Sequence, residues 1–311
     1  MLNIALIFPG QGSQSVGMGK DFFDNTDIAK EIFKKADEIL EKPLSEICFE
    51  GPEDSLKQTI NTQPAILTVS IIAYEVLKSK YNLIFKYTAG HSLGEYSALY
   101  ASEVLDFETC LKLVKKRSEA MDEAPNGAMT AIMGLQQEKL EEIINEVSAE
   151  GIVSIANYNT PEQLVITGAP ESVDLAGSKA KEAGAKRVLP LPVSGAFHSA
   201  LMKKPSNEFA QESRNYKFST AKVPVITNID AVPTTEGFND KLVSQIYSSV
   251  RWTQTIEYMK GNGIETFIEL GPGKVLSGMV KKIDRKLNVL NVADMASLDA
   301  TLSALGVKLN V

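Results

Sequence analysis

The sequence predicts an α/β protein in which a smaller domain is inserted into a larger one. With 311 residues, 44% of them hydrophobic, the chain can bury a sizeable core. Residues 1–8 form a mostly apolar run typical of a first buried strand, and the loop after it is rich in glycine. Residues 128–191 follow the order β-α-β-β-α-β, which is the ferredoxin-like signature. These observations together predict a large α/β domain with a ferredoxin-like insertion.

The other elements follow from periodicity and from helix start signals. Thr62-Gln63-Pro64 is expected to open a fully buried helix, with the proline near its first turn. Asp106 is the expected N-cap of a helix that runs to Met121. In the larger domain we also expect a helix over 27–40, a strand over 224–228, a helix over 238–250 and the last sheet strand over 266–270. In the insertion we expect strands over 128–134, 152–157, 163–168 and 185–191, and helices over 138–147 and 172–183.

Charge and cysteine content exclude several classes of protein. The net charge is −7 and no long Lys/Arg cluster is present, which argues against nucleic acid or an anionic membrane as the main partner. Cys48 and Cys110 lie far apart without metal-ligand spacing, so we expect no metal site and no disulfide framework. The N-terminus lacks a basic leader and a cleavage site, and the apolar run 65–74 is too short to span a bilayer. We therefore expect a cytoplasmic protein.

The segment Gly90-His91-Ser92-Leu93-Gly94 has the pattern of a nucleophile elbow. A strand is expected before it and a helix after it, so the serine would lie on a tight turn between glycines. The helix that starts at Leu93 points free backbone N–H groups and its positive dipole end at the serine, where an oxyanion would form. The context predicts that Ser92 is a catalytic nucleophile.

A serine nucleophile needs a base within hydrogen-bond reach, and the chain contains two histidines. His91 lies beside the nucleophile, and adjacent residues on such a turn point apart, so we expect it to pack or to orient. His198 lies in a run of small residues and is the preferred base. The acid of an ordinary α/β-hydrolase triad precedes the histidine in the chain, where Asp106, Asp122 and Asp174 lie. A backbone carbonyl could orient the imidazole instead.

An arginine lies on the apolar face of the helix over 106–121. Cys110, Val114, Arg117 and Met121 follow helical spacing and share one face, where an unpaired guanidinium is costly. Two interpretations remain open: an internal salt bridge, or a bidentate fork that holds the carboxylate of a ligand. A second glycine-rich run, Gly271-Pro272-Gly273-Lys274, lacks the spacing and the Ser or Thr of a phosphate loop, so we reject an NTP site.

Taken together, the motifs resemble the malonyl-CoA:acyl-carrier-protein transacylases of fatty-acid synthesis. The resemblance runs from end to end through the segments 10–14, 51–54, 61–65, 90–95, 195–199 and 271–274 and through Arg117. It implies an α/β-hydrolase-like core with a parallel sheet, formed by residues 1–126 and 196–311, and a ferredoxin-like subdomain over residues 127–195. One departure, Ala-Ser-Glu-Val at 101–104, follows the elbow helix and is not expected to touch the chemistry.

The resemblance also implies a role for each matching residue. Ser92 would be the nucleophile, His198 the base and Arg117 the ligand of the malonyl carboxylate. The backbone N–H groups of Gln11 and Leu93 would form the oxyanion hole. The backbone carbonyl of Gln245 would hold the histidine. The substrate pocket would contain His91, Met121 and the malonyl-selective Phe197.

The implied activity is transfer of a malonyl group from malonyl-CoA to acyl carrier protein through a malonyl-serine ester, by a monomer without a metal or redox cofactor. Three alternatives stay open at this point. A serine thioesterase or esterase would be expected to supply an acid and would release malonate. An acyltransferase that serves a polyketide synthase would share almost every residue. A catalytically silent docking subunit is disfavoured because the three reactive side chains are present.

Overall fold

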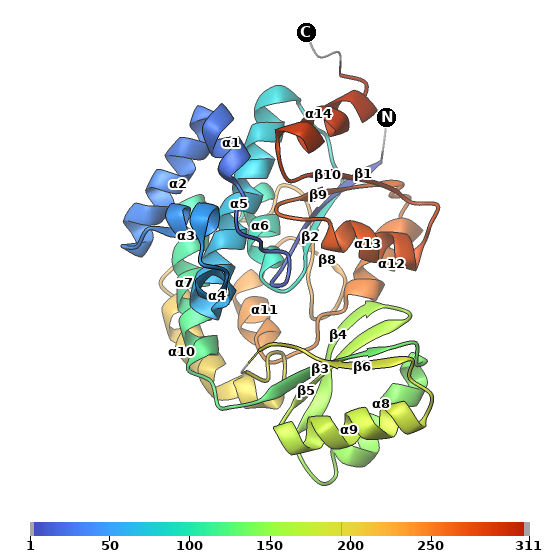
Figure 1. The fold of residues 1–311 in the computed structure, drawn as a ribbon. Helices are drawn as coiled ribbons and strands as arrows, with labels where there is room; N and C mark the ends of the chain where they lie inside the picture. The colour runs from blue at the N-terminus through green and yellow to red at the C-terminus, as the bar shows by residue number, and fades with distance from the viewer. Residues whose placement is uncertain (1–2, 194, 308–311) are drawn as a thin grey trace.

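The computed structural model describes residues 3–193 and 195–307 as two sheets and the helices around them (Figure 1). The larger sheet has six strands in the order β10-β9-β1-β2-β7-β8, and the smaller has four in the order β4-β5-β3-β6. The predicted fold class is therefore confirmed. Residues 1–2, predicted as part of the first strand, and residues 194 and 308–311, assigned to the two predicted domains, lie outside the described residues.

The larger sheet is parallel except at one edge. Its strands are β1 (Ile4–Phe8), β2 (Tyr87–Gly90), β7 (Val225–Ile226), β8 (Pro233–Thr234), β9 (Thr266–Leu270) and β10 (Asn288–Val292). β8 pairs antiparallel with β7, because the loop over 227–232 is too short for the crossover that a parallel pair needs. The prediction that 266–270 is the last sheet strand is wrong, since β10 pairs with β9. β10 contains Asn288 and Asn291 and lies at an edge, so it lacks the apolar run of a central strand.

Helices cover both faces of the larger sheet, and the strand β1 shows why. Leu6 and Phe8 pack into one hydrophobic cluster, while Ala5 and Ile7 pack into another, because alternate side chains point to opposite faces. Figure 1 shows α5 and α7 on one side of the sheet and α12 and α13 on the other. The helices of this unit are α1 (Lys20–Asn25), α2 (Asp27–Leu40), α3 (Leu44–Glu50), α4 (Glu53–Lys57), α5 (Thr59–Lys80), α6 (Gly94–Ala101), α7 (Phe107–Asp122), α10 (Lys203–Ser213), α11 (Phe238–Gln245), α12 (Trp252–Gly261), α13 (Val275–Ile283) and α14 (Met295–Ala304), with a 3₁₀ turn at Ala200–Met202.

The buried helix α5 starts earlier than predicted. It begins at Thr59, so Pro64 lies inside the helix rather than near its first turn. A proline there has no N–H for the carbonyl of Ile60, and Nζ of Lys42 donates to that oxygen instead, at 2.8 Å. This helix is long and apolar enough to cross a membrane, but 89% of its most apolar window is buried inside the protein. It is therefore a core helix.

The smaller sheet confirms the predicted β-α-β-β-α-β order. Its elements are β3 (Ala128–Met133), α8 (Gln137–Val147), β4 (Val153–Thr160), β5 (Gln163–Gly168), α9 (Pro170–Glu182) and β6 (Arg187–Pro190). Ile132, Leu164 and Ile166 pack against α8 and α9, whereas Met129 and Val165 join the main core on the other face. This sheet therefore lies between its own helices and the larger unit. The domain boundaries at 126/127 and 195/196 stay a prediction.

Candidate active site

The elbow lies where the carboxyl ends of β1 and β2 meet. Ser92 has φ 50°, a left-handed conformation that costs an ordinary residue about 1–2 kcal/mol. The glycines on either side are required by close backbone contacts: a Cβ at Gly90 would lie 1.9 Å from the carbonyl carbon of Gly94, and one at Gly94 would lie 2.1 Å from the Phe8 oxygen. The side chain of Asn228 holds the bend by accepting from the Ser92 N–H at 2.7 Å. The strained turn thus presents the serine at the edge of the sheet.

His198 is placed to act as the base for Ser92. Its Nε2 lies 2.8 Å from the serine Oγ, while its Nδ1 contacts the carbonyl oxygens of Gln245 at 2.8 Å and Ser248 at 3.1 Å. Carbonyl oxygens only accept, so the ring proton resides on Nδ1 and Nε2 is free to take the serine proton. The two carbonyls occupy the position of a triad acid.

None of the three aspartates considered for that position lies there. Asp106 caps α7 by accepting from the N–H of Thr109, while Asp122 and Asp174 are exposed on helices. Burial, followed by the positive charge of Arg117, lowers the pKa of His198 to about 3. The imidazole is therefore neutral at physiological pH and can accept a proton.

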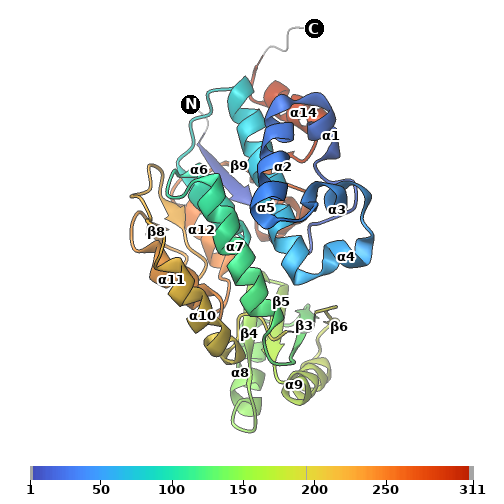
Figure 2. The ribbon, with the colours of Figure 1, turned by 90° about the vertical axis from the view of Figure 1, so that its left-hand side faces the viewer.

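Arg117 lies in the C-terminal half of α7, which runs from the larger sheet toward the smaller one (Figure 2). Its side chain is 1% exposed and makes none of the ion pairs found in residues 3–193 and 195–307, so no internal salt bridge forms. Nη1 donates to Oε1 of Gln63 at 2.7 Å, and Nη2 donates to Ser92 Oγ and to Gln245 Oε1, each at 3.0 Å.

These three hydrogen bonds leave part of the guanidinium available. An arginine carries five N–H donors, and Nε of Arg117 is buried without a partner in the described structure. A buried cation with unused donors is the arrangement that an anionic ligand would complete. The geometry therefore favours the second of the two interpretations of this arginine.

The backbone N–H groups of Gln11 and Leu93 are the expected oxyanion donors. Gln11 follows β1, Leu93 precedes the first residue of α6, and both line the same cavity as Ser92. Within the described residues neither N–H donates a hydrogen bond. Gly10 lets the two loops touch, since a Cβ there would lie 2.4 Å from the His91 oxygen. The two donors are thus positioned by loops in direct contact.

A small cavity brings nearly all the predicted residues together. Its volume is about 110 Å³. It is lined by Gln11, His91, Ser92, Leu93, Arg117, Met121, Met129, Asn157, Leu191, Val193, Phe197 and His198. Of the predicted site residues only Gln245 does not line it; this residue contacts Arg117 and His198 from behind. The cavity is small enough to suit a short acyl group.

His91 packs against other elements, as expected, and also lines the small cavity. Its Nε2 lies 2.8 Å from Oδ1 of Asn159 in β4, and its ring meets Trp252 edge-on at 5.7 Å between centroids. Burial lowers the pKa of His91. The residue therefore connects the elbow to the smaller sheet.

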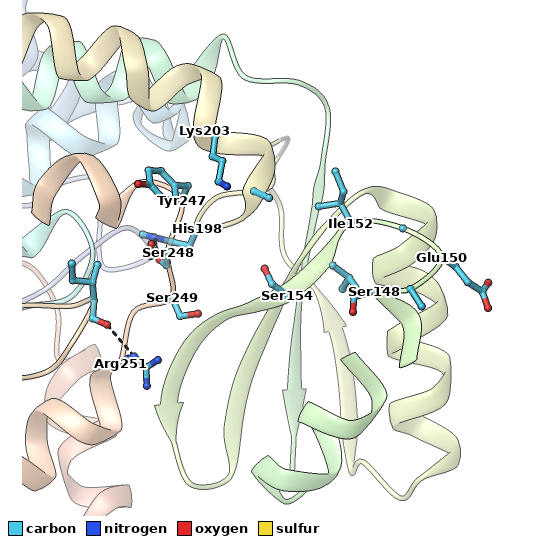
Figure 3. Close-up of a pocket in the computed structure, with 15 residues that line it drawn as sticks. Ser148, Glu150, Ile152, Ser154, His198, Lys203, Tyr247, Ser248, Ser249 and Arg251 are labelled. Carbon is cyan, nitrogen blue, oxygen red and sulfur yellow. Dashed lines mark hydrogen bonds between the residues drawn. The ribbon is translucent and has the colours of Figure 1, made fainter. Parts of the chain in front are cut away.

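A larger cleft opens on the other side of His198 (Figure 3). Its volume is about 830 Å³. It lies between one side formed by Lys203, Tyr247, Ser248, Ser249 and Arg251 and another formed by residues 148–154, which include the start of β4. Figure 3 shows His198 beside Ser248 on the same side of the cleft as Lys203 and Tyr247, and His198 also lines the small cavity. A long polar substrate arm could reach His198 through this cleft.

The sequence reasoning missed several residues that hold the site. Gln63 hydrogen-bonds to Arg117, Glu95 to Gln245, and Asn228 to Ser92. No chemical argument from the sequence had singled out the first residue of each pair. Glu95 was detectable as the lone acid of α6, whose other residues are apolar or neutral. The apolar wall from Met129, Leu191 and Val193 had no motif, because it comes from the smaller sheet and the returning segment. No group of His, Cys, Asp and Glu side chains in the described chain has the arrangement of a metal site.

Comparison with known proteins places the chain among transferases. Residues 5–300 match the family model of the acyl transferase domain. The chain is 45% identical to the malonyl CoA-acyl carrier protein transacylase of Bacillus subtilis (strain 168), over 98% of each protein. It is 43% identical to the protein of the same name from Haemophilus influenzae, over 96% of this chain and 98% of that protein.

Solved structures agree with this placement. An acyl carrier protein S-malonyltransferase from Vibrio cholerae superposes with a TM-score of 0.93 at 43% identity, over 96% of this chain and 99% of that one. A malonyl-transacylase in complex with a type II PKS acyl-carrier protein superposes with a TM-score of 0.94 at 39% identity, over 97% and 99%. The whole architecture is therefore shared, and not only the elbow.

Proposed function

The chain belongs to the malonyl CoA-acyl carrier protein transacylases, and from this membership we propose that it moves the malonyl group of malonyl-CoA to the phosphopantetheine thiol of an acyl carrier protein in fatty-acid biosynthesis. One observation carries the proposal for the site. The buried guanidinium of Arg117, with unused donors, lies beside the Ser92–His198 pair in a cavity of about 110 Å³. A short acyl group with a free carboxylate matches both the charge and the size.

The first half-reaction loads the serine. As Ser92 Oγ attacks the thioester carbonyl, its proton moves to Nε2 of His198, and the carbonyl oxygen becomes an oxyanion facing the N–H groups of Gln11 and Leu93. One such donor contributes about 2.7–4 kcal/mol of transition-state stabilisation. The C–S bond then breaks, the CoA sulfur takes the proton from His198, and a malonyl-serine ester remains. No step consumes electrons, so the reaction needs no redox cofactor.

The second half-reaction reverses the roles. The carrier thiol gives its proton to Nε2 of His198 and its sulfur attacks the ester carbonyl. When the C–O bond breaks, Ser92 recovers the proton and the malonyl thioester leaves on the carrier. The cleft of about 830 Å³ beside His198 supports this sequence, because each thiol must approach the same imidazole on a long arm.

Two experiments test the transfer itself. After incubation with malonyl-CoA, mass spectrometry should find one malonyl group on Ser92 and none on a Ser92→Ala variant. Labelling of that variant would show that the nucleophile is misassigned. Addition of a holo-carrier should then move the label to the carrier thiol, whereas release of free malonate without a carrier would indicate a thioesterase.

Selection for malonyl is assigned to Arg117. We predict that Arg117→Ala lowers kcat/KM for malonyl loading of Ser92 at least about a hundredfold more than for acetyl loading, because an ion pair in a dry site is lost with the guanidinium. Lys112→Ala, on the exposed side of the same helix, is the matched control and should leave both rates unchanged. Equal losses for both acyl groups would remove the selectivity role.

The relative solved with a type II PKS carrier supports a second candidate, an acyltransferase for polyketide synthesis. Transfer rates to a fatty-acid carrier and to a polyketide carrier would separate the two. We further propose that the protein acts as a monomer, because one chain supplies Ser92, His198 and Arg117. The buried free thiols of Cys48 and Cys110 support a reducing, cytoplasmic location.

A further inference from the structure

We propose that Glu95 is a positioning residue for acyl selectivity: its carboxylate fixes the side-chain amide of Gln245, and that amide orients the guanidinium of Arg117 toward the acyl pocket. The inference rests on the proposed function, since it names a further determinant of the malonyl group. Glu95 lies on α6, just after the elbow, and is 1% exposed. The proposed mechanism gives this buried acid no role.

An unbroken chain of hydrogen bonds connects Glu95 to Arg117. Oε2 of Glu95 accepts from Nε2 of Gln245 at 2.9 Å, and Oε1 of the same amide accepts from Nη2 of Arg117 at 3.0 Å. Gln245 is 0% exposed and Arg117 is 1% exposed, so water does not compete with these contacts. The carboxylate therefore acts on the guanidinium through one amide.

Glu95 determines which end of the Gln245 side-chain amide faces Arg117. A glutamine side chain has a donor end and an acceptor end, and the two can exchange by a flip. A carboxylate that accepts hydrogen bonds holds the NH₂ end, which leaves only the oxygen for Arg117. The carbonyl of Ser92 reinforces this orientation by accepting from the same nitrogen at 3.0 Å. After a flip, two donors would face each other and the guanidinium would have to turn.

The same arrangement leaves Arg117 free for a ligand. A direct salt bridge to a carboxylate would use the fork that recognises the malonyl group. Here Glu95 accepts from the side-chain amide of Gln245 instead. The Nε–H group of Arg117 has no hydrogen-bond partner in the described structure. Burial lowers the pKa of Arg117, and the neighbouring Tyr96 and Glu95 oppose that change. Burial raises the pKa of Glu95 to about 7, while the hydrogen bonds from Gln245 and Asn228 favour its ionised form.

Glu95 has a second contact, and the experiment must separate the effect of that contact from the effect on Gln245. Oε2 also accepts from the backbone N–H of Asn228 at 3.0 Å, and the Asn228 side chain holds the bend at Ser92. Loss of this contact would slow both malonyl and acetyl loading, because the nucleophile serves both. The ratio of the two kcat/KM values cancels that general loss and reports only on the carboxylate site.

The first test compares two variants of similar size. Glu95→Met removes the acceptor, and we expect the malonyl-to-acetyl ratio to fall about tenfold or more, as loss of a hydrogen bond to a charged group implies. Glu95→Gln can still offer an oxygen to Gln245, and its ratio should stay within about threefold of the wild type. Should Glu95→Met fail to fold, Glu95→Asp draws the acceptor back by one methylene and carries the same expectation. An unchanged ratio in the variant that folds overturns the proposal.

A double-mutant cycle tests whether the effect passes through Gln245. In a Gln245→Ala background, which keeps the carbonyl that holds His198, adding Glu95→Met should lower the ratio no further. Additive losses would show that Glu95 acts on the pocket by another route, and the proposal would then be wrong.

Glu269 provides a matched control. It is also a fully buried acid, and its carboxylate accepts from Leu276 and Ser277 at the start of α13, away from the cavity. Glu269→Met should lower the melting temperature and leave the ratio unchanged; an equal fall would mean that any lost buried acid disturbs the pocket. If the wild type never loads malonyl onto Ser92, the proposed function fails. If it does and Glu95→Met keeps the ratio, only the role of Glu95 fails.

Discussion

At the scale of single residues, the charge of Arg117 acts on the base before any substrate binds. Its Nη2 donates to Ser92 Oγ at 3.0 Å, and the serine lies 2.8 Å from His198. A cation so close favours the neutral imidazole and polarises the hydroxyl. In the proposed complex a malonyl carboxylate pairs with the guanidinium, which would relieve this repulsion and let His198 hold the transferred proton more easily. The residue to which we assign substrate selection would therefore also tune the base.

This coupling predicts a change in pH dependence. In Arg117→Ala the pKa of His198 should rise from about 3 toward its ordinary value, because the second cause of the shift is removed while burial remains. The acid limb of Ser92 reactivity should then move to higher pH, since the protonated imidazole cannot act as a base. The measurement is the rate of inactivation by a neutral sulfonyl fluoride from about pH 3, where the wild-type limb is expected, to about pH 8. An unmoved limb would contradict the coupling.

At the scale of elements, the elbow depends on how closely α6 approaches β1. Gly94 opens α6 directly against the backbone of β1, where a Cβ would lie 2.1 Å from the oxygen of Phe8. The atoms that an added Cβ would meet are backbone atoms, so they cannot move aside as a flexible side chain could. The glycine thus sets the distance between the helix N-terminus and the sheet, and with it the position of the Leu93 N–H.

We predict that Gly94→Ala lowers the free energy of unfolding by about 1–3 kcal/mol and slows loading of Ser92, as overpacking does in a closed core. Gly278→Ala in α13 is the control, because nothing lies within 4 Å of its added Cβ. It should be neutral or stabilise by up to about 1 kcal/mol through helix propensity. Urea denaturation and a loading assay measure both quantities; a neutral Gly94→Ala would refute the close contact.

The proline inside α5 gives a second prediction at this scale. Lys42→Met removes the donor that satisfies the Ile60 carbonyl and should cost about 1–3 kcal/mol of the free energy of unfolding. In a Pro64→Ala background the restored N–H can bond that carbonyl, so the same substitution should cost less. Urea denaturation of the four proteins gives the coupling energy. A coupling of zero would show that the lysine does not replace the lost bond.

At the scale of the whole molecule, the smaller sheet holds the acceptors of the catalytic histidine. The N–H of Val250 donates to Ala156 in β4 at 2.8 Å, and Tyr158 returns a bond to the Val250 carbonyl at 2.9 Å. Ser249 Oγ donates to the Ile155 carbonyl at 2.5 Å. This stretch directly follows the Ser248 carbonyl that contacts His198. The smaller sheet is therefore bonded directly to the segment that holds the histidine.

We predict that the hydrogen bonds between the segment 249–250 and β4 open together. The amides of Val250 and Tyr158 should exchange with solvent deuterium at similar opening free energies, and Ser249→Ala should lower the protection of both by about 1 kcal/mol. Hydrogen exchange followed by mass spectrometry or NMR measures this. Loss of protection at Val250 alone would show that the sheets open independently.

The sequence by itself determined the order of the elements and the reactive side chains. Glycine spacing around Ser92, helical spacing at Arg117 and strand–helix alternation over 128–191 are local, because backbone sterics and periodicity act over a few residues. Local signals failed where a contact decides the structure. They placed the start of α5 too late, missed the edge strand β10, and left the orienting group of the histidine and the partner of the arginine open.

Only the tertiary structure decided how the reactive groups are held. Asn228 reaches Ser92 across 136 positions and Gln245 reaches Glu95 across 150, so no periodic pattern relates them. A buried arginine can form an ion pair with an acid of the protein or keep donors available for a ligand. Which of the two occurs depends on the atoms that lie within about 3 Å of the guanidinium. The resemblance to a family implied the carbonyl of Gln245, but the place of Glu95 behind it follows from a hydrogen bond between side chains of α6 and α11. Side-chain hydrogen bonds depend on distance in space, and distance in space is set only when the chain has folded.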